Sequence, residues 1–302
     1  MLHSNRELFE QTVLRTADAT GIAASIIEKD YYVTEFLRKL TSYQPDIVFK
    51  GGTSLSKCYK LIQRFSEDID LNVEDRPSEG QRKALKRNIV AVIDDLDLSL
   101  SNAEEIRSRR DYNRYVIAYD SVIPMASDAL KAAVLLETSY TAVSFPTVLL
   151  PVHSYIGDMM EQEAPDAIEE YNLNPFEMKV QEIDRTLADK VFAVCDYYLQ
   201  GKVAKHSRHL YDIYKLLPLV PQNENFRELV KEVRAVRAQS VVCPSALPEA
   251  DVPELLEKII KERAYKQDYD SLTTQLLEEN VPYDTVIAAL KKVAENSLFE
   301  NN

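Results

Sequence analysis

The fold is decided by the stretch from Phe49 to Leu71, F-K-G-G-T-S-L-S-K-C-Y-K-L-I-Q-R-F-S-E-D-I-D-L. The residues from Asp46 to Phe49 end in an apolar run and predict a short strand. Gly51 and Gly52 then predict a sharp turn, because glycine adopts tight backbone conformations at little cost and lets backbone N–H groups approach a ligand. The stretch therefore begins as a strand that ends in a donor-rich turn.

The second half of this stretch predicts a helix and another strand. Leu55 to Gln63 has a helical apolar period, and Thr53 or Ser54 is a suitable N-cap. Asp68 and Asp70 then alternate with aliphatic residues, as in a strand with one buried face. Because a strand repeats every two residues, we expect both carboxylates to point to the same side.

This pattern favours a site for a metal-bound nucleoside triphosphate. Two acids on one strand face repel each other unless a cation lies between them, and a donor-rich turn favours phosphate. Two clustered carboxylates suit two-metal catalysis, in which the ions bind the attacking and leaving oxygens. The structural alternative is a glycine turn beside surface acids.

The same residues resemble a known family. G-G-T-S followed by S-x-D-I-D resembles the nucleotidyltransferase signature of the DNA polymerase beta superfamily. I-E-K-D-Y-Y (27–32) and R-F-S-E-D-I-D-L (64–71) are similar to the AbiEii-like toxin nucleotidyltransferases, which include MenT-type enzymes. The resemblance runs to about Leu217. It implies an α/β (α+β) fold: a nucleotidyltransferase domain with a small mixed sheet over 1–164, and a mostly helical domain over 165–302.

The resemblance also implies the site residues. The expected metal ligands for Mg²⁺ or Mn²⁺ are Asp68, Asp70 and Glu137. The expected nucleotide-binding residues are Gly51, Gly52, Thr53, Ser54, Arg64, Ser66 and Lys190. The expected catalytic residues are Asp68, Asp70, Lys190 and Asp212.

Two of these residues also stand out from their local sequence. Glu137 is an acid inside the apolar strand predicted over 131–140, where a lone carboxylate is costly unless it is paired or binds metal. The alternative is a solvent-facing glutamate. Lys190 borders the apolar stripe of a helix predicted over 185–199 and capped by Asp184, so its ammonium could reach a triphosphate. The alternative is a snorkelling lysine.

Other charged residues are ambiguous. Relatives show R-D-x-x-D where this chain has R-H-L-Y-D, so His209 replaces the first acid, and Arg208 and Asp212 could simply pair at i, i+4. Glu28, Lys29 and Asp30 are consecutive and fan around a predicted helix, which favours solvated charges. The resemblance alone keeps Lys29 and Asp30 as supports for the site.

Composition predicts a globular, soluble, cytoplasmic protein. Of 302 residues 45% are hydrophobic and 28% charged, and the three cysteines form no C-x-x-C pair. We therefore expect reduced thiols, with no signal peptide and no membrane span. Further helices are predicted over 7–19, 23–40, 78–98, 207–217, 252–263 and 283–295, and a further strand over 112–122.

The sequence defines the acceptor of the nucleotide less well than it defines the nucleotide site. By resemblance it is tRNA, with a role in growth arrest or phage defence and a cognate antitoxin as partner. The cluster Arg107, Arg109, Arg110 and Arg114 suits RNA phosphates, although the net charge of −13 opposes a polyanion. A small-molecule or protein acceptor, or a non-catalytic nucleotide-binding module, are the alternatives.

Overall fold

The computed structural model describes residues 1–64, 66, 68–124, 132–140 and 142–300. The chain forms two compact units. Unit 1 consists of Met1–Tyr59, Glu67–Tyr140 and Thr147–Val180, and unit 2 of Lys60–Ser66, Thr141–Pro146 and Gln181–Asn302. These units are defined by contacts within the chain. The boundary between 164 and 165 concerns domains that fold independently, and it stays a prediction.

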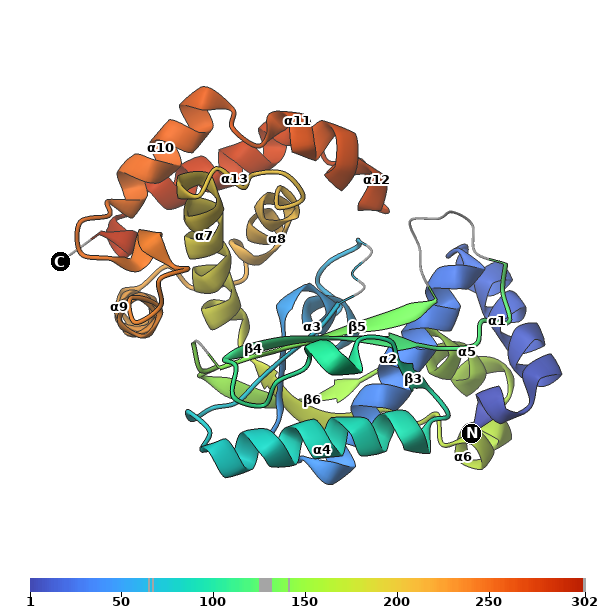
Figure 1. The fold of residues 1–302 in the computed structure, drawn as a ribbon. Helices are drawn as coiled ribbons and strands as arrows, with labels where there is room; N and C mark the ends of the chain where they lie inside the picture. The colour runs from blue at the N-terminus through green and yellow to red at the C-terminus, as the bar shows by residue number, and fades with distance from the viewer. Residues whose placement is uncertain (65, 67, 125–131, 141, 301–302) are drawn as a thin grey trace. The chain divides into compact units, whose positions relative to one another are not determined.

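Unit 1 is built on a seven-stranded sheet with the order β3-β4-β5-β2-β1-β7-β6 (Figure 1). Its strands are β1 (Val48–Lys50), β2 (Asp68–Asn72), β3 (Ser99–Leu100), β4 (Tyr112–Ala118), β5 (Ala133–Ser139), β6 (Thr147–Val152) and β7 (Phe176–Gln181). β1 is antiparallel to β2 and parallel to β7, whereas β2 is parallel to β5. The expected α/β class with a mixed sheet is therefore confirmed.

The helices of unit 1 pack around this sheet. They are α1 (Arg6–Thr20), α2 (Ala24–Tyr43), α3 (Gly51–Lys57), α4 (Glu79–Asp95), α5 (Tyr155–Glu163) and α6 (Pro165–Tyr171), with short 3₁₀ turns at Leu2–Ser4 and Ala103–Glu105. α2 contacts α1, α4, α5 and β5. α4 begins with a capping box between Ser78 and Gln81, which satisfies two otherwise unpaired N–H groups.

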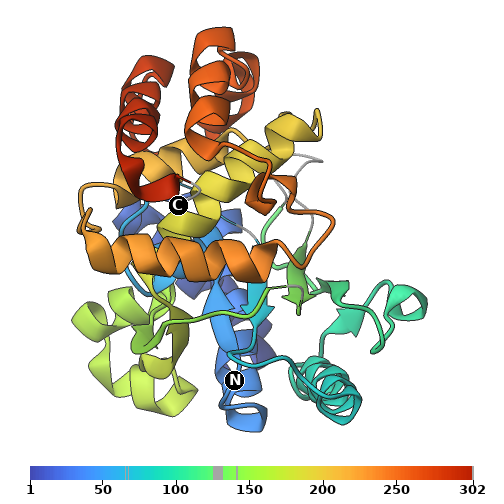
Figure 2. The same cartoon turned by 90° about the vertical axis from the view of Figure 1, so that its left-hand side faces the viewer.

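Unit 2 is helical among its described residues. Its helices are α7 (Ile183–Leu199), α8 (Arg208–Leu216), α9 (Glu224–Arg237), α10 (Val252–Glu262), α11 (Lys266–Asp268), α12 (Thr274–Leu276) and α13 (Tyr283–Glu295), with a π turn at Tyr269–Thr273 and 3₁₀ turns at Pro244–Ala246 and Ser297–Phe299. α7 packs on α8, α9 and α10, and α13 packs on α8 and α10. Figure 2 shows α9 lengthwise.

The helix predicted over 55–63 is wrong in its bounds, because only 55–57 are helical. α3 runs from Gly51 to Lys57 instead, and Lys60 has a left-handed φ of 54°. The following residues belong to unit 2, where the Gln63 N–H donates to the Tyr211 hydroxyl and the Gln63 carbonyl accepts from the Glu278 N–H. These tertiary hydrogen bonds outweigh the local helical period.

Two smaller expectations also fail. α7 begins one residue before Asp184, with Glu182 at the N-cap position and no side-chain cap. Glu28, Lys29 and Asp30 are not solvated: Glu28 is fully buried and accepts from the Val122 N–H at 2.7 Å. Glu28 and Lys29 are buried and Asp30 is half-buried, and Glu28 and Asp30 have partners distant in sequence.

Asp30 ties three parts of unit 1 together. Its carboxylate pairs with the ammonium of Lys57 at the end of α3, and accepts from the Tyr155 N–H at the start of α5 at 3.0 Å. The resemblance implies that Asp30 supports the site. In the structure Asp30 contacts the end of α3 through Lys57 and so helps to place that helix.

Candidate active site

The glycine turn and the acidic strand of unit 1 are in direct contact. The antiparallel register of β1 and β2 places Lys50 opposite Asp70, so Gly51 follows immediately beside that acid. Gly51 has φ +82°, and a Cβ built on it would lie 2.0 Å from Asp70 Oδ2. Any larger residue would displace the carboxylate, so Gly51 is required by both its backbone conformation and this close approach.

The hydroxyl groups of Thr53 and Ser54 donate to backbone carbonyls, one on β2 and one in the turn. Thr53 donates to the Asp68 carbonyl at 2.5 Å, and Ser54 donates to the Gly51 carbonyl at 2.9 Å. Both side chains are buried. Neither is the N-cap of α3, which is Lys50. The two hydroxyls hold α3 and the turn against β2, and their contact with phosphate stays a prediction.

The acids lie on one half-exposed face of the sheet. Asp68 and Asp70 are half-buried, as is Glu137, while Ile69 and Leu71 point into the core. Parallel pairing of β2 with β5 places Glu137 directly beside Asp70. The expected strand around Glu137 is confirmed as β5, although Lys131 lies outside the described residues.

Two residues of β4 approach these acids, and the sequence did not predict them. Arg114 lies opposite Glu137, with Nε 3.7 Å from its carboxylate. Tyr112 lies on the same face, and its pKa is raised, first by burial and then by a hydrogen bond to Glu137. The period-two alternation of Tyr112 and Arg114 was visible in the sequence, but their pairing with β5 was not.

The donor set of this face suits a hard divalent cation. Mg²⁺ prefers carboxylate oxygens, which Asp68, Asp70 and Glu137 supply. Among the residues that the structure describes, no group of three or more His, Cys, Asp or Glu side chains is arranged to hold a metal ion. The three-ligand set therefore stays a prediction, whereas the adjacency of Asp70 and Glu137 is a feature of the sheet.

Unit 2 contains a buried cluster of opposite charges. Asp212 on α8 is 0% exposed and receives two hydrogen bonds from Arg64, at 2.7 and 2.9 Å. Lys190 on α7 adds an ion pair to the same carboxylate at 2.8 Å. Burial alone would raise the pKa of Asp212, but the two cations hold it far below its usual range. Asp212 therefore stays ionised at neutral pH.

Lys190 does not extend its ammonium to water as a snorkelling lysine would. It is 8% exposed, and burial lowers its pKa while Asp212 opposes that shift. Its ammonium also lies 3.3 Å from Nδ1 of His209. Lys190 and Asp212, which the resemblance names separately as site residues, are in direct contact, and Arg64 from the chain segment before β2 pairs with the same carboxylate. Ser66 is half-buried in that same segment.

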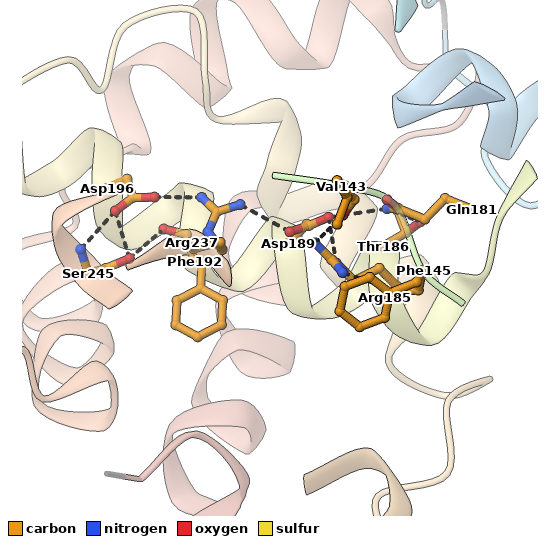
Figure 3. Close-up of polar contacts among 10 residues, drawn as sticks. All are labelled: Val143, Phe145, Gln181, Arg185, Thr186, Asp189, Phe192, Asp196, Arg237 and Ser245. Carbon is orange, nitrogen blue, oxygen red and sulfur yellow. Dashed lines mark hydrogen bonds and ion pairs between the residues drawn. The ribbon is translucent and has the colours of Figure 1, made fainter. Parts of the chain in front are cut away.

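A second polar network fixes α7, which carries Lys190 (Figure 3). Arg185 donates to the carbonyls of Val143 and Phe145 and to Asp189 one turn later, each at 3.1 Å. Arg237 from α9 bridges Asp189 at 3.0 Å and Asp196 at 2.6 Å.

The far end of this network holds the 3₁₀ turn before α10. Asp196 accepts from the N–H and the hydroxyl of Ser245. Sequence reasoning missed these positioning residues. The signal was present in the spacing of Asp189 and Asp196, because residues seven apart share a helix face.

A glycine turn set against an acidic strand on a mixed sheet defines the class of this protein as a nucleotidyltransferase. Residues 35–291 match the family described as nucleotidyl transferase AbiEii toxin, type IV TA system. The chain belongs to this family, and is a nucleotidyltransferase toxin of a type IV toxin–antitoxin system. Membership implies a nucleoside triphosphate as substrate and an antitoxin as partner.

A solved structure shares the fold. MenT4, a nucleotidyltransferase toxin from Mycobacterium tuberculosis, is similar over 95% of this chain and 88% of its own, with a TM-score of 0.50 and 16% sequence identity. The comparison with curated proteins gives no match. Within the described residues, no helix is both long and apolar enough to cross a membrane.

Proposed function

We propose that this protein transfers a nucleoside monophosphate from a nucleoside triphosphate to tRNA, in the cytoplasm, as a toxin that arrests growth or limits phage. The observation that carries the proposal is the contact between Gly51 and Asp70. It places the glycine turn directly against a strand with two acids on one face, and a phosphate-binding turn beside metal-binding acids is what nucleotidyl transfer needs.

Each residue of unit 1 has a defined part in this proposal. Asp68 and Asp70, with Glu137 beside them, would hold Mg²⁺ or Mn²⁺ through carboxylate oxygens. The bound metal would activate the acceptor hydroxyl and stabilise charge on the reacting phosphate. Gly51 and Gly52 would bind phosphate oxygens through backbone N–H groups. The acceptor hydroxyl then attacks the α-phosphate, and pyrophosphate leaves.

In unit 2, Lys190 is the proposed phosphate-binding cation. Asp212 orients its ammonium, and Arg64 holds Asp212 in place from the other side through two hydrogen bonds. Arg64 is almost fully buried on this carboxylate. Its part in the proposal is therefore to position Asp212 and Lys190.

The arginines of unit 1 support an RNA acceptor unequally. Arg109 is paired with Glu79 and Arg114 with Glu137. Arg107 and Arg110 are exposed, and their guanidinium groups donate to backbone carbonyls; within the described residues neither has an acidic partner. These two cations are the better candidates for RNA phosphates. Acids farther than about 8 Å away are largely screened at physiological salt.

The acceptor is tested by labelling. The protein is incubated with each α-labelled nucleoside triphosphate, Mg²⁺ or Mn²⁺, and total cell extract, which is then separated into RNA, protein and small molecules. We expect label in the tRNA fraction. Label confined to small molecules or proteins would contradict the RNA acceptor and move the function to that alternative, which the net charge of −13 favours.

A matched pair of variants tests the arginines. Replacing both Arg107 and Arg110 with Ala should reduce tRNA labelling and flatten its salt dependence, because phosphate contacts release counterions. Arg109→Ala is the control, since Arg109 is exposed like the other two but is paired with Glu79. Equal effects of the double variant and the control would show that the unpaired arginines do not bind RNA.

A further inference from the structure

The ammonium of Lys190 lies between two acceptors of different charge. Asp212 Oδ2 is 2.8 Å from Nζ and His209 Nδ1 is 3.3 Å from it. An ammonium carries three N–H donors. Among the residues that the structure describes, Lys190 has two partners, Asp212 and His209. The third N–H of its ammonium is therefore left for a ligand.

The contact fixes the state of His209. A protonated lysine donates, so Nδ1 must accept, and the imidazole is neutral with its hydrogen on Nε2. The surroundings agree: burial lowers the pKa of His209 well below its usual value, and Lys190 and Arg208 lower it further, with Asp212 opposing. His209 is therefore a neutral acceptor at physiological pH.

The ring of His209 is also held in orientation. It lies nearly parallel to Tyr197 of α7, with ring centroids 5.7 Å apart, and Tyr197 stacks on His206 at 3.5 Å. Three parallel rings restrict the rotation of the imidazole. Nδ1 therefore keeps facing Lys190.

The neutrality of His209 sets the charge of the cluster. Among the described residues that contact one another here, Arg64 and Lys190 contribute two positive charges, and Asp212 one negative charge. A carboxylate at position 209 would cancel the remaining positive charge, whereas a neutral imidazole accepts a hydrogen bond and leaves it in place. The cluster thus keeps a net attraction for an anion.

We propose that His209 is a positioning residue: it accepts one hydrogen of Lys190, so that the third N–H is directed to a phosphate of the nucleoside triphosphate. This inference rests on the proposed phosphate-binding role of Lys190. It adds that the lysine must be oriented by a neutral acceptor as well as by Asp212.

The test compares two replacements of His209. His209→Asn keeps a neutral acceptor near the position of Nδ1, and His209→Leu fills the space without one. Asp284→Asn is the control, because it changes an exposed side chain of unit 2 that pairs with Arg263 and belongs neither to the charged cluster nor to the ring stack. The readouts are KM and kcat for the nucleoside triphosphate, calorimetric binding of inorganic pyrophosphate, and the unfolding midpoint of each variant.

We expect His209→Leu to raise KM and weaken pyrophosphate binding by about ten-fold, the effect of losing one hydrogen bond to a charged group. The fall in kcat should be smaller, His209→Asn should recover most of the loss, and Asp284→Asn should bind as the wild type does. If the Leu variant does not fold, His209→Ala takes its place. Equal binding by the Leu, Asn and wild-type proteins would overturn the inference.

Lys190→Ala separates this inference from the function on which it rests. If Lys190→Ala weakens pyrophosphate binding and His209→Leu does not, only the role of His209 fails. If Lys190→Ala also leaves binding unchanged, Lys190 does not bind phosphate, and the inference falls with that role. Transfer of label by the wild type tests the enzymatic activity separately from both.

Discussion

The carboxylates on the acidic face of unit 1 and the carboxylate in the charged cluster of unit 2 differ in burial and in their charged partners. Asp68 and Asp70 are half-buried on a sheet face that also carries Glu137. Asp212 is fully buried and neutralised by two cations. Acids gathered on an accessible face repel one another, so this arrangement is better explained by function than by stability. A buried acid with matched cations holds structure and orients its partners.

The largest expected difference between the two regions is the effect of a single substitution on the rate of nucleotide transfer. Asp70→Asn should lower nucleotide transfer by at least about 100-fold, the scale of losing one electrostatic stabiliser in an active site. The unfolding midpoint should not fall, because one charge on the crowded face is removed. Asp68→Asn should behave alike. Transfer rates and thermal unfolding measured on the same preparations check this, and a wild-type rate in either variant would refute the metal assignment.

The next effect is on stability. Asp212→Asn leaves Arg64 and Lys190 buried without their anion, and breaking a buried pair in this way costs about 3–5 kcal/mol. Denaturant unfolding measures the loss. Asp284→Asn is the control: it removes an exposed partner of Arg263, so stability should hardly change. Equal stability of the two variants would mean that the buried cluster is not what organises α7 and α8.

A smaller effect tests the contact within the acidic face. Gly51→Ala imposes a left-handed φ on alanine, at a cost of about 1–2 kcal/mol, and its Cβ would push Asp70 aside. Gly21→Ala carries a similar strain at φ +73° but meets open space. We expect Gly51→Ala to lose at least as much stability as Gly21→Ala, and only Gly51→Ala to lose transfer. Equal transfer rates in the two would break the link between the turn and the acid.

The sequence was most informative where local spacing carries the signal. The alternation of Asp68 and Asp70 predicted a strand with both acids on one face, and the two glycines predicted the end of β1, where they form the first residues of α3. It was least informative where partners are distant. Lys50 and Tyr112 approach the acids only through strand pairing, and strand register cannot be read from single segments.

Unit 2 shows the same limit more strongly. Lys190 was found because it borders an apolar stripe, but its pairing with Asp212 was not predicted from the sequence. Arg64 lies 148 residues from Asp212, so their hydrogen bonds depend on how the chain returns to α8. The helical period over 55–63 misled for the same reason: hydrogen bonds from Gln63 to residues far along the chain decided the backbone there.

The central claim is that a nucleoside monophosphate is transferred, and the position of the label tests it most directly. Parallel reactions receive the triphosphate labelled at the α-phosphate or at the γ-phosphate, with Asp70→Asn as the inactive control. The account predicts α-label in the acceptor and γ-label in released pyrophosphate. Label from the γ-phosphate in the acceptor, or from neither position, would contradict it.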